Sequence, residues 1–376
     1  MDRVALAGAA TALVGVALLP FVELRANRIV TGESLRVWSS AGWLGWVLVA
    51  MALLGLVAAV LPRWSRAPAV LAAGVAGFSA WVFAMGGSAA CLMPAGDSAA
   101  RVSVASGAWL ALVGIAMVWF DGNRSVGSSR ARLLAGAVAV AAVLGAWYLG
   151  GLSKTGLVYE YLNESDTFWT LTLNHVGLSV GGTAIAALLG VPLGIAASRT
   201  AVVRATVIPA AGIVQTVPSL ALYGLLIIPL GLLGLPTLGA APALIALTLY
   251  ALLPIVRNTY LGVSGVDPAI IDAGRGMGMS RRELLWRVEM PLALPLMLEG
   301  VRVALVMTIG VAAVMGIIGA QTLGVLIYQG FGGIAPDLVL LGAIPMVVIS
   351  IIADQGVRTL EHSIVSPGIR PLHGQD

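Results

Sequence analysis

The sequence predicts an all-α polytopic membrane protein with about ten transmembrane helices. Of its 376 residues, 59% are hydrophobic and only 10% are charged, against roughly 25% charged residues in a soluble domain. The hydrophobic residues gather into ten runs close to the ~20 residues that a helix needs to cross a bilayer. This composition excludes soluble enzymes, nucleic-acid-binding proteins and disordered proteins. The single cysteine, Cys91, can form no internal disulfide, and we expect no metal site.

Residues 1–150 are expected to form an N-terminal accessory membrane region of about five helices. The apolar runs cover residues 4–21, 41–61, 67–85, 102–120 and 133–150. Eight of the ten tryptophans precede residue 151, several of them at predicted helix ends, where an indole ring favours the lipid–water interface. The first run follows Arg3 as in a signal peptide. No small-x-small cleavage site follows it, so we expect a retained membrane anchor rather than a cleaved signal.

Residues 151–168 are expected to form an extracytoplasmic linker, because Glu160, Glu164 and Asp166 make this segment too polar to cross a membrane. Residues 169–362 form the second membrane domain. Its apolar runs cover residues 169–197, 205–230, 238–262, 294–319 and 338–360. These runs are rich in glycine and proline, as expected where helices pack closely or break around a path. Residues 363–376 are expected to form a cytoplasmic tail.

The arginine positions predict how the chain is oriented, because basic residues concentrate in cytoplasmic loops. A cytoplasmic N-terminus places the following arginines inside: Arg63, Arg66, Arg124, Arg130, Arg132, Arg199, Arg204, Arg275, Arg281, Arg282 and Arg287. The expected outer connections at 231–236 and 330–337 contain no lysine or arginine. Arg25, Arg28 and Arg36 disagree with this bias. We therefore expect a multi-pass protein with both termini in the cytoplasm.

One predicted cytoplasmic loop carries strong local folding signals. Asp267 followed by Pro268 is typical of an N-cap and the first position of a helix. Ser280 with Glu283 three residues later forms a capping box that opens a second helix. The glycines between these signals predict the end of the first helix and a turn: Gly274, Gly276 and Gly278. The result is a short amphipathic helix–turn–helix at the membrane surface, after which Pro291 begins the next membrane helix.

This loop has three possible roles. An amphipathic hairpin can simply anchor the loop to the membrane surface, or its helix can fill a groove on a partner protein. A nucleotide-binding loop is disfavoured, because no strand precedes the glycines and no Lys-Ser or Lys-Thr pair follows them. The only lysine of the chain, Lys154, lies in an expected outer segment. We therefore expect that this chain is not an enzyme and is not its own ATPase.

The spacing within the loop also carries a resemblance. The positions concerned are Asp272, Ala273, Gly274, Gly278, Val288, Met290 and Pro291. They resemble the coupling loop of importer-type ABC permeases, with the pattern Glu-Ala-Ala, three residues, Gly, nine residues and Ile-x-Leu-Pro. The spacing is kept throughout, and the four substitutions within it are mild. The resemblance covers about residues 169–360 and implies an importer-type ABC permease core in the C-terminal half.

Such a core implies an assembly of several proteins. Two permease subunits form the path, the second being either a copy or a different chain, and two cytoplasmic ATP-binding subunits dock on the coupling loops. An extracytoplasmic substrate-binding protein delivers the solute. ATP is then bound by the partner subunit, so we expect this chain to hold no cofactor and to bind no nucleic acid. The implied location is the bacterial cytoplasmic (inner) membrane, with Asp272 facing the ATPase groove and Gly278 allowing the close turn.

Two further stretches resemble the osmoprotectant branch of that family, which imports glycine betaine, choline, carnitine or proline. They are Gln-Thr-Val-Pro-Ser-Leu-Ala-Leu at 215–222 and Tyr-Ala-Leu-Leu-Pro-Ile-Val-Arg-Asn-Thr-Tyr at 250–260. The alternatives are an ABC permease for another small polar solute such as an amino acid, an ion-coupled secondary transporter, and a membrane sensor or scaffold. Secondary transporters usually keep ionisable groups near the bilayer midplane. No carboxylate of this chain lies at the middle of a predicted span.

Five residues are candidates for lining the translocation path. They are Asn174 in the outer part of its helix, and Gln215, Thr216, Pro218 and Ser219, which interrupt an apolar run. Pro218 frees backbone carbonyls, and such groups inside a membrane must face protein or water. The alternative for this interruption is a packed kink with no role in transport.

The remaining polar residues of the predicted spans are expected to have structural roles. We expect His175 to make an interhelical hydrogen bond. Glu299 and Arg302 lie three apart on one helical face, where an ion pair is expected. Asp354 lies near the end of the last predicted helix, and we expect it at the inner surface rather than in an ion site.

Overall fold

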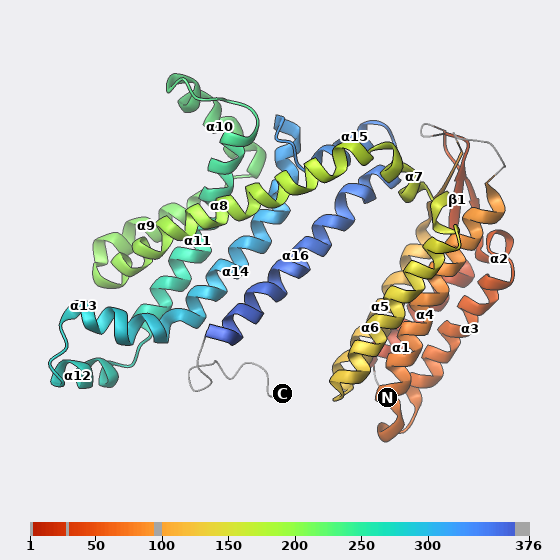
Figure 1. The fold of residues 1–376 in the computed structure, drawn as a ribbon, viewed down its shortest axis with the longest axis horizontal. Helices are drawn as coiled ribbons and strands as arrows, with labels where there is room; N and C mark the ends of the chain where they lie inside the picture. Colours follow the sequence, from red (N-terminus) through yellow and green to blue (C-terminus); the bar gives the residue numbers. More distant parts are fainter. Residues whose placement is uncertain (1–2, 28–29, 94–99, 365–376) are drawn as a thin grey trace. The chain divides into compact units, whose positions relative to one another are not determined.

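The structure is a computed structural model that describes residues 3–27, 30–93 and 100–364. These residues form two compact units (Figure 1). The first unit comprises Met1–Glu164 and Gly330–Leu338, and the second comprises Ser165–Gln329 and Val339–Asp376. Most of the tail expected at 363–376 lies outside the described residues, which end at position 364.

The first unit consists of helices and one small sheet. Its helices are α1 (Arg3–Leu18), α2 (Val37–Ser40), α3 (Trp43–Val60), α4 (Arg63–Leu92), α5 (Ser106–Ser125), α6 (Ser129–Tyr148), the 3₁₀ turn η1 (Leu152–Lys154) and α7 (Gly156–Asn163). Its strands are β1 (Val22–Arg25), β2 (Glu33–Leu35) and β3 (Arg101–Val104), paired antiparallel in the order β2-β1-β3. In this register Val22 of the central strand lies opposite Leu35 and Val104.

Glycines bring the helices of the first unit into close contact. A Cβ added to Gly114 of α5 would lie 2.3 Å from the carbonyl oxygen of Gly8 in α1. A Cβ on Gly74 of α4 would lie 2.6 Å from the Cα of Trp119. Because only a hydrogen atom fits at these positions, the helix backbones approach as closely as in small-residue packing within membranes.

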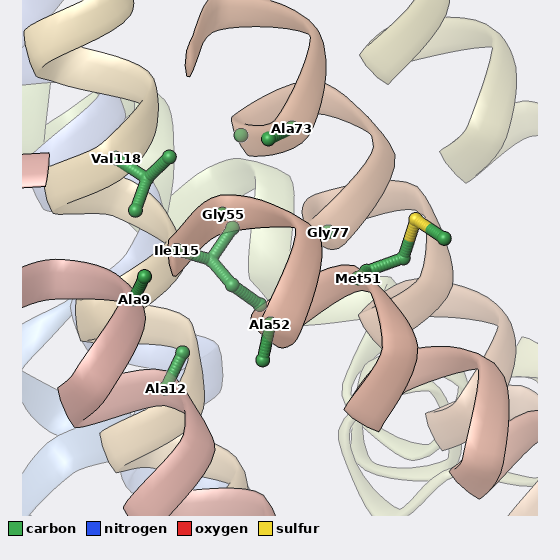
Figure 2. A pocket seen from close by; sticks show the side chains of 10 residues that line it. Ala9, Ala12, Met51, Ala52, Gly55, Ala73, Gly77, Ile115 and Val118 are labelled. Carbon is green, nitrogen blue, oxygen red and sulfur yellow. The ribbon is translucent and has the colours of Figure 1, made fainter. Parts of the chain in front are cut away.

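Small residues also line an apolar hollow among α1, α3, α4 and α5 (Figure 2). The lining residues are Ala9, Ala12, Met51, Ala52, Gly55, Ala73, Gly74, Gly77, Ile115 and Val118. None of these side chains carries an N–H or O–H group that could hold a polar solute. The hollow is therefore part of the helix packing and not a candidate transport site.

A buried ion pair holds the sheet of the first unit to α7. Arg101 Nε of β3 donates to Glu160 Oε1 of α7 at 2.9 Å, and the Glu160 side chain is fully buried. Arg25 of β1, one of the arginines that disagree with the predicted charge bias, pairs with Glu23 at 3.0 Å. Arg25 also donates through Nη1 to the carbonyl oxygen of Ile334 at 3.0 Å. Arg25 therefore finds both an opposite charge and a hydrogen-bond acceptor within the first unit.

The segment Gly330–Leu338 joins the first unit through a second buried contact. Ser103 Oγ of β3 donates to Asp337 Oδ2 at 2.5 Å, and Asp337 is only 3% exposed. A Cβ on Gly156 would lie 2.2 Å from the same carboxylate oxygen. The Asp337 carboxylate therefore occupies space that only a glycine at position 156 leaves free.

The second unit is almost entirely helical. Its elements are α8 (Ser165–Arg199), α9 (Ala201–Thr216), α10 (Ser219–Leu232), α11 (Ala240–Ser264), α12 (Pro268–Gly276), α13 (Arg281–Leu284), the π-helical turn η2 (Leu285–Glu289), α14 (Met290–Val314) and the 3₁₀ turn η3 (Met315–Ile318). Helices α15 (Gly324–Gly332) and α16 (Pro336–Ile364) extend at their adjoining ends into the segment Gly330–Leu338, which belongs to the first unit. Helices α8, α11 and α14 form the centre of this unit, packed through glycines: a Cβ on Gly182 would lie 2.8 Å from Leu247 Cβ, and one on Gly300 would lie 2.8 Å from the Pro254 carbonyl oxygen.

The predicted all-α polytopic fold is confirmed. Seven helical stretches among the described residues are long and apolar enough to cross a membrane, or eight if the bent pair α9–α10 counts as one span. They are Trp43–Val60, Ser65–Leu92, Ser129–Tyr148, Ser165–Arg199, Ala240–Ser264, Arg281–Ile318 and Pro336–Ile364. This number is close to the ten runs that the sequence predicts.

Three of the predicted runs differ from the structure in physical detail. The first gives the 16-residue helix α1, which stops before Pro20 because a residue that precedes proline disfavours the helical conformation. The run at 102–120 begins within strand β3, and its helix α5 starts at Ser106. The run at 205–230 is not one straight helix, because α9 and α10 meet at an angle of 110°.

Candidate functional site

The coupling-loop segment, residues 267–291, folds into the helical hairpin that its caps predict. Asp267 Oδ1 accepts a hydrogen bond from the backbone N–H of Ala269 at 2.8 Å, and Pro268 stands in the first turn of α12. Ser280 and Glu283 form a complete capping box at the start of α13. Figure 1 shows this α12–α13 hairpin beyond the ends of α11 and α14.

One glycine of the hairpin has a different role from the one expected. Gly276 is the last residue of α12, as predicted, but Gly274 lies inside the helix and does not end it. Gly274 is instead buried, and a Cβ there would lie 2.6 Å from Leu284 Cδ1, so it lets α12 pack on α13. Only Gly278 adopts the left-handed conformation, with φ of +81°. The expectation that Gly278 allows the turn agrees with this geometry.

Several residues of the hairpin face outward. Asp272 is exposed and forms an ion pair with Arg275 at 3.1 Å, and Ala273 beside it is also exposed. The structure also exposes three apolar side chains that were not expected on this surface: Ile270 is 44% exposed, Met277 72% and Trp286 58%. An exposed set of apolar and charged side chains on a short helix is typical of a helix that fits into a partner's groove.

The hairpin continues directly into α14. The turn η2 and α14 follow α13 without an irregular residue between them, and Pro291 lies in the first turn of α14. The last residue of η2, Glu289, is 1% exposed, and its Oε2 accepts a hydrogen bond from Nη2 of Arg199 at the end of α8. This ion pair was also missed, because the two residues are far apart in the chain.

The interrupted run around Pro218 forms the break between α9 and α10. Gln215 Nε2 donates to the Tyr250 carbonyl oxygen at 2.8 Å. The Tyr250 hydroxyl in turn donates to the carbonyl oxygen of Val217. Thr216 is exposed and donates to its own helix at the Ile213 carbonyl, 2.7 Å away. A backbone carbonyl at the break is thus satisfied by α11, as expected for irregular backbone at membrane depth.

Pro218 and Ser219 begin the next helix. Pro218 is the N-cap of α10, and Ser219 is its first residue and is half-buried. The four residues Gln215, Thr216, Pro218 and Ser219 therefore lie together in one short bend. The structure does not bring these four residues together with Asn174, which lies in α8 and lines a cavity.

Asn174 is exposed and lines an open cavity of about 310 Å³ in the second unit. The other lining residues are Leu173, Gly177, Leu178, Ala240, Gly319 and Gln321. Gln321, which was not expected at this site, supplies a second carboxamide from the segment that follows η3. The cavity therefore offers two uncharged polar groups in an otherwise apolar wall.

A polar seam connects α8 with α14. His175 Nε2 lies 3.0 Å from the Ile309 carbonyl oxygen, which confirms the expected interhelical hydrogen bond. Thr183 Oγ1 and Thr308 Oγ1 lie 3.0 Å apart, with both side chains buried. These contacts fix the two helices against each other and leave His175 in a structural role.

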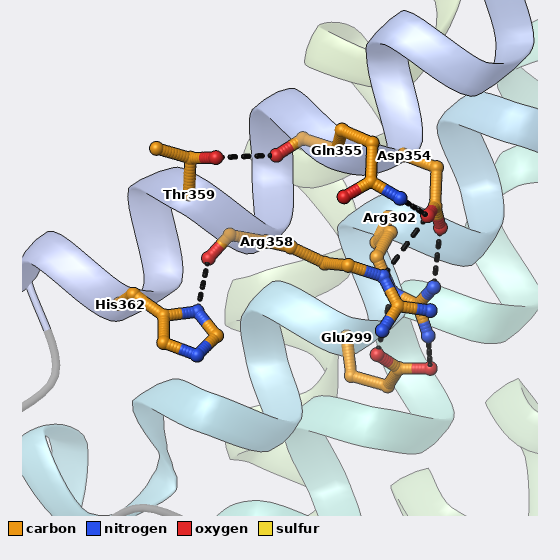
Figure 3. A network of polar contacts seen from close by, with 7 residues as sticks. All are labelled: Glu299, Arg302, Asp354, Gln355, Arg358, Thr359 and His362. Atoms are coloured by element: carbon orange, nitrogen blue, oxygen red, sulfur yellow. Dashed lines mark hydrogen bonds and ion pairs between the residues drawn. The ribbon is translucent and has the colours of Figure 1, made fainter. Parts of the chain in front are cut away.

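A charged network connects α14 with α16 (Figure 3). Glu299 and Arg302 form the expected ion pair. Arg302 also donates to Asp354, and Arg358 donates to the same carboxylate at 2.9 Å. Asp354 therefore pairs with two arginines, which is typical of a structural ion pair and not of a site that binds a transported ion.

Comparison with known proteins agrees with this architecture. Residues 2–158 match the family model "ABC transporter permease YehY, N-terminal domain", and residues 188–366 match "Binding-protein-dependent transport system inner membrane component". The inward-facing MetNI methionine ABC transporter aligns with a TM-score of 0.50 and 20% identity, over 54% of this chain and 99% of that chain. At this identity the likeness shows the fold alone.

Curated relatives align with the C-terminal part of the chain. The osmoprotectant import permease protein OsmW of Salmonella typhimurium is 37% identical over 213 residues, which is 57% of this chain and 99% of the relative. The carnitine transport permease protein OpuCB of Listeria monocytogenes is 38% identical, over 53% of this chain and 88% of the relative. The choline transport system permease protein OpuBB of Bacillus subtilis is 34% identical, over 54% and 90% respectively. With nearly the whole of such a relative matched, the chain belongs to the family of binding-protein-dependent ABC importer permeases and is the membrane component of an importer that works with ATPase and substrate-binding partners.

Proposed function

We propose that this permease imports an osmoprotectant such as glycine betaine, choline, carnitine or proline, driven by a separate ATPase that docks on the coupling loop. The relatives named above are permeases for osmoprotectants, carnitine and choline. The observation that carries the docking part is the rigid, outward-facing hairpin of α12 and α13. This hairpin keeps the spacing of the family's coupling loop.

The docking surface combines charge and apolar area. Asp272 and Arg275 present opposite charges on α12, while Met277 and Trp286 present exposed apolar side chains. Buried apolar area at a partner's groove supplies affinity, and the charges supply register and selectivity. On this proposal Asp272, Ala273, Gly274, Gly278 and Pro291 form the coupling element. ATP is bound by the partner subunit, and this chain contributes no cofactor of its own.

The path is proposed to be weakly polar and uncharged. Asn174 and Gln321 face the open cavity, and the bend at Gln215, Thr216, Pro218 and Ser219 provides irregular backbone against α11. A quaternary ammonium group is usually recognised by aromatic faces. None of the described residues that line the cavity is aromatic. Selectivity is therefore proposed to reside mainly in a separate extracytoplasmic binding protein.

The assembly is proposed to contain a second permease subunit, which is either a copy of this chain or a different one. Residues 1–150 form an accessory membrane region, residues 151–168 an extracytoplasmic linker and residues 169–362 the permease core. The arginine bias supports an inner-membrane protein with both termini in the cytoplasm. In that orientation the α12–α13 hairpin faces the cytoplasm, where an ATPase can reach it.

Uptake measurements test the substrate assignment. Bacterial cells that lack their own osmoprotectant importers would express the full chain with its ATPase and binding protein. Labelled glycine betaine, choline, carnitine and proline would be offered separately. We expect accumulation of at least one of them, and its loss when the binding protein is omitted. Failure of all four while another solute class is accumulated would contradict the assignment. Selective uptake without the binding protein would place the recognition site in the permease itself.

A further inference from the structure

The α12–α13 hairpin is built to move as one piece. Gly274 packs against Leu284, where a Cβ would lie only 2.6 Å from Leu284 Cδ1. The backbone N–H of Met279 donates to the Gly274 carbonyl oxygen at 3.2 Å. The capping box at Ser280 fixes where the second helix begins. A force applied to α12 is therefore carried to α13 with little loss in the turn between them.

The hairpin is joined to the membrane helix without a flexible connection. Arg281–Ile318 forms one continuous helical stretch of 38 residues. Within it, Leu285–Glu289 forms a π-helical turn. Single π-helical turns inside α-helices are rare and frequently occur at functional sites. Any displacement of the hairpin consequently reaches α14 through this turn.

The π-helical turn ends in a buried charge. Glu289 is 1% exposed, and its Oε2 is paired with Arg199, whose side chain is 48% exposed. Among the described residues, no hydrogen-bond partner reaches Glu289 Oε1. A buried carboxylate is costly unless it is paired, and removing one partner of such a pair leaves an uncompensated charge. The arginine therefore ties the base of the hairpin to the end of α8.

The helices around this pair leave little room for independent motion. A Cβ on Gly194 of α8 would lie 2.6 Å from Thr259 Cβ of α11, and a Cβ on Gly262 of α11 would lie 3.0 Å from the Ala293 carbonyl oxygen of α14. Packed interiors of this kind transmit displacement instead of absorbing it. Movement at Glu289 is consequently conveyed to α8.

Helix α8 connects the pair to the cavity. It runs as one helix from Ser165 to Arg199. Asn174 stands about 25 residues before Arg199, which corresponds to roughly 37 Å along a helix. The same helix thus carries the charged pair near one end and a cavity-lining side chain near the other.

We propose that Glu289 and Arg199 are positioning residues that transmit the ATP-driven displacement of the hairpin to α8 and, through α8, to the cavity at Asn174. This inference rests on the proposed docking of an ATPase at the hairpin. It goes beyond that docking, because neither residue belongs to the docking surface and neither touches the solute cavity. The pair acts during the ATP-driven displacement of the hairpin and is not required for the ATPase to bind.

The test uses the full chain assembled with its ATPase and binding protein in vesicles. Glu289→Gln keeps the shape of the side chain and removes its charge, and Arg199→Gln removes the partner. The exchanged pair Arg199→Glu with Glu289→Arg restores opposite charges. Arg204→Gln is the matched control, because it removes the same charge from an arginine of α9 whose contacts are with one tyrosine. The Arg204 guanidinium lies 3.4 Å from the Tyr260 hydroxyl and 5.9 Å from the centre of its ring.

Three quantities would be measured for each variant. The first is the amount of ATPase bound per permease, and the second is the uptake of labelled glycine betaine. The third is the response to ATP of a nitroxide label at Leu173→Cys, in a chain that also carries Cys91→Ser. Leu173 is 70% exposed and lies beside Asn174, so the label reports on α8 at the cavity whatever the solute is.

For both single variants we expect ATPase binding within about twofold of wild type, with uptake and the nitroxide response reduced roughly tenfold. The exchanged pair is expected to regain a substantial part of the uptake and of the nitroxide response. Arg204→Gln is expected to behave as wild type.

An unchanged nitroxide response in both single variants would overturn the proposal. Equal loss of ATPase binding and of uptake would also overturn it, since the pair would then be needed only for assembly. An ATPase that fails to bind the wild-type chain would instead refute the docking on which the proposal rests. If Glu289→Gln fails to fold, the half-exposed Arg199→Gln still decides the question.

Discussion

Gly278 is the residue of the coupling loop whose conformation is most demanding. Its φ of +81° lies in the left-handed region, where a β-branched residue is strongly disfavoured. Gly276, two positions earlier, ends α12 and has open space around its Cβ position. The two glycines therefore allow the effect of backbone conformation to be separated from the effect of side-chain size.

Gly278→Val is expected to strain the turn by about 1–3 kcal/mol and to displace α13 from α12. ATPase association and uptake should fall together, while membrane insertion stays intact. Gly276→Val is the matched control, because it adds the same side chain at a position whose backbone is not left-handed. Copurification of the ATPase with each variant would measure the difference. Equal association of the ATPase with both variants would refute a role of the turn in docking.

At the scale of residues, the sequence revealed what is encoded locally. The caps at Asp267 and Ser280 act on neighbours two or three positions away, and both are present as predicted. Glu289 could not be recognised, because its burial depends on Arg199 in another helix. Gln321 was missed because it lies in a short irregular segment, where no periodic pattern indicates which way a side chain points.

The break between α9 and α10 shows how one proline changes an element. An apolar run predicted as one span bends by 110°, since the residue before Pro218 cannot continue the helix. Val217 has the extended angles φ −72° and ψ 127°, and its carbonyl oxygen is captured by the Tyr250 hydroxyl. At the break the Val217 carbonyl oxygen thus receives its hydrogen bond from a side chain of α11.

Tyr250→Phe is expected to weaken this bend by about 1 kcal/mol, because the Val217 carbonyl oxygen loses its donor. Uptake should fall while the ATPase remains bound, since the α12–α13 hairpin is unaffected. Tyr223→Phe is a suitable comparison, because the Tyr223 hydroxyl makes only a 3.5 Å contact with the Gly239 carbonyl oxygen. Initial uptake rates of the two variants, at equal amounts of inserted protein, provide the measurement. Wild-type uptake by Tyr250→Phe would show that this hydrogen bond at the bend has no role in transport.

The contact between Asp337 and the first unit is a second element whose role can be tested. Gly156→Val would place a Cβ 2.2 Å from Asp337 Oδ2 and disrupt the hydrogen bond from Ser103. Leaving a buried polar group unsatisfied costs about 1–3 kcal/mol, so the unfolding temperature in detergent should fall. Gly127→Val, where nothing lies within 4 Å of the added Cβ, should leave it unchanged. Equal unfolding temperatures of the two variants would show that this contact adds no stability.

At the scale of the whole molecule, hydropathy predicted the polytopic helical fold but neither the small sheet nor the place of Gly330–Leu338 in the first unit. Strands of three or four residues, such as β2 and β3, are too short to show alternation. The assignment of Gly330–Leu338 to the first unit depends on Asp337 meeting Ser103, more than two hundred residues earlier in the chain. Long-range contacts of this kind leave no periodic signal in the sequence.

Two features of the chain separate an ABC permease from an ion-coupled carrier at this scale. The coupling loop presents a rigid outward hairpin, for which a carrier has no need. The charged groups between α14 and α16 form ion pairs with one another, and Asp354 pairs with both Arg302 and Arg358. Transport is therefore expected to depend on ATP hydrolysis by the docked subunit and not on an ion gradient across the membrane.

The most direct test of this account is the uptake of labelled glycine betaine into vesicles that contain the purified permease, its ATPase and its binding protein. Uptake would be followed with and without ATP, with an ionophore that collapses ion gradients, and with the docking variant Asp272→Lys. The account predicts uptake that requires ATP, resists the ionophore and is abolished by Asp272→Lys together with ATPase binding. Uptake that persists without the ATPase and stops when ion gradients are collapsed would contradict it.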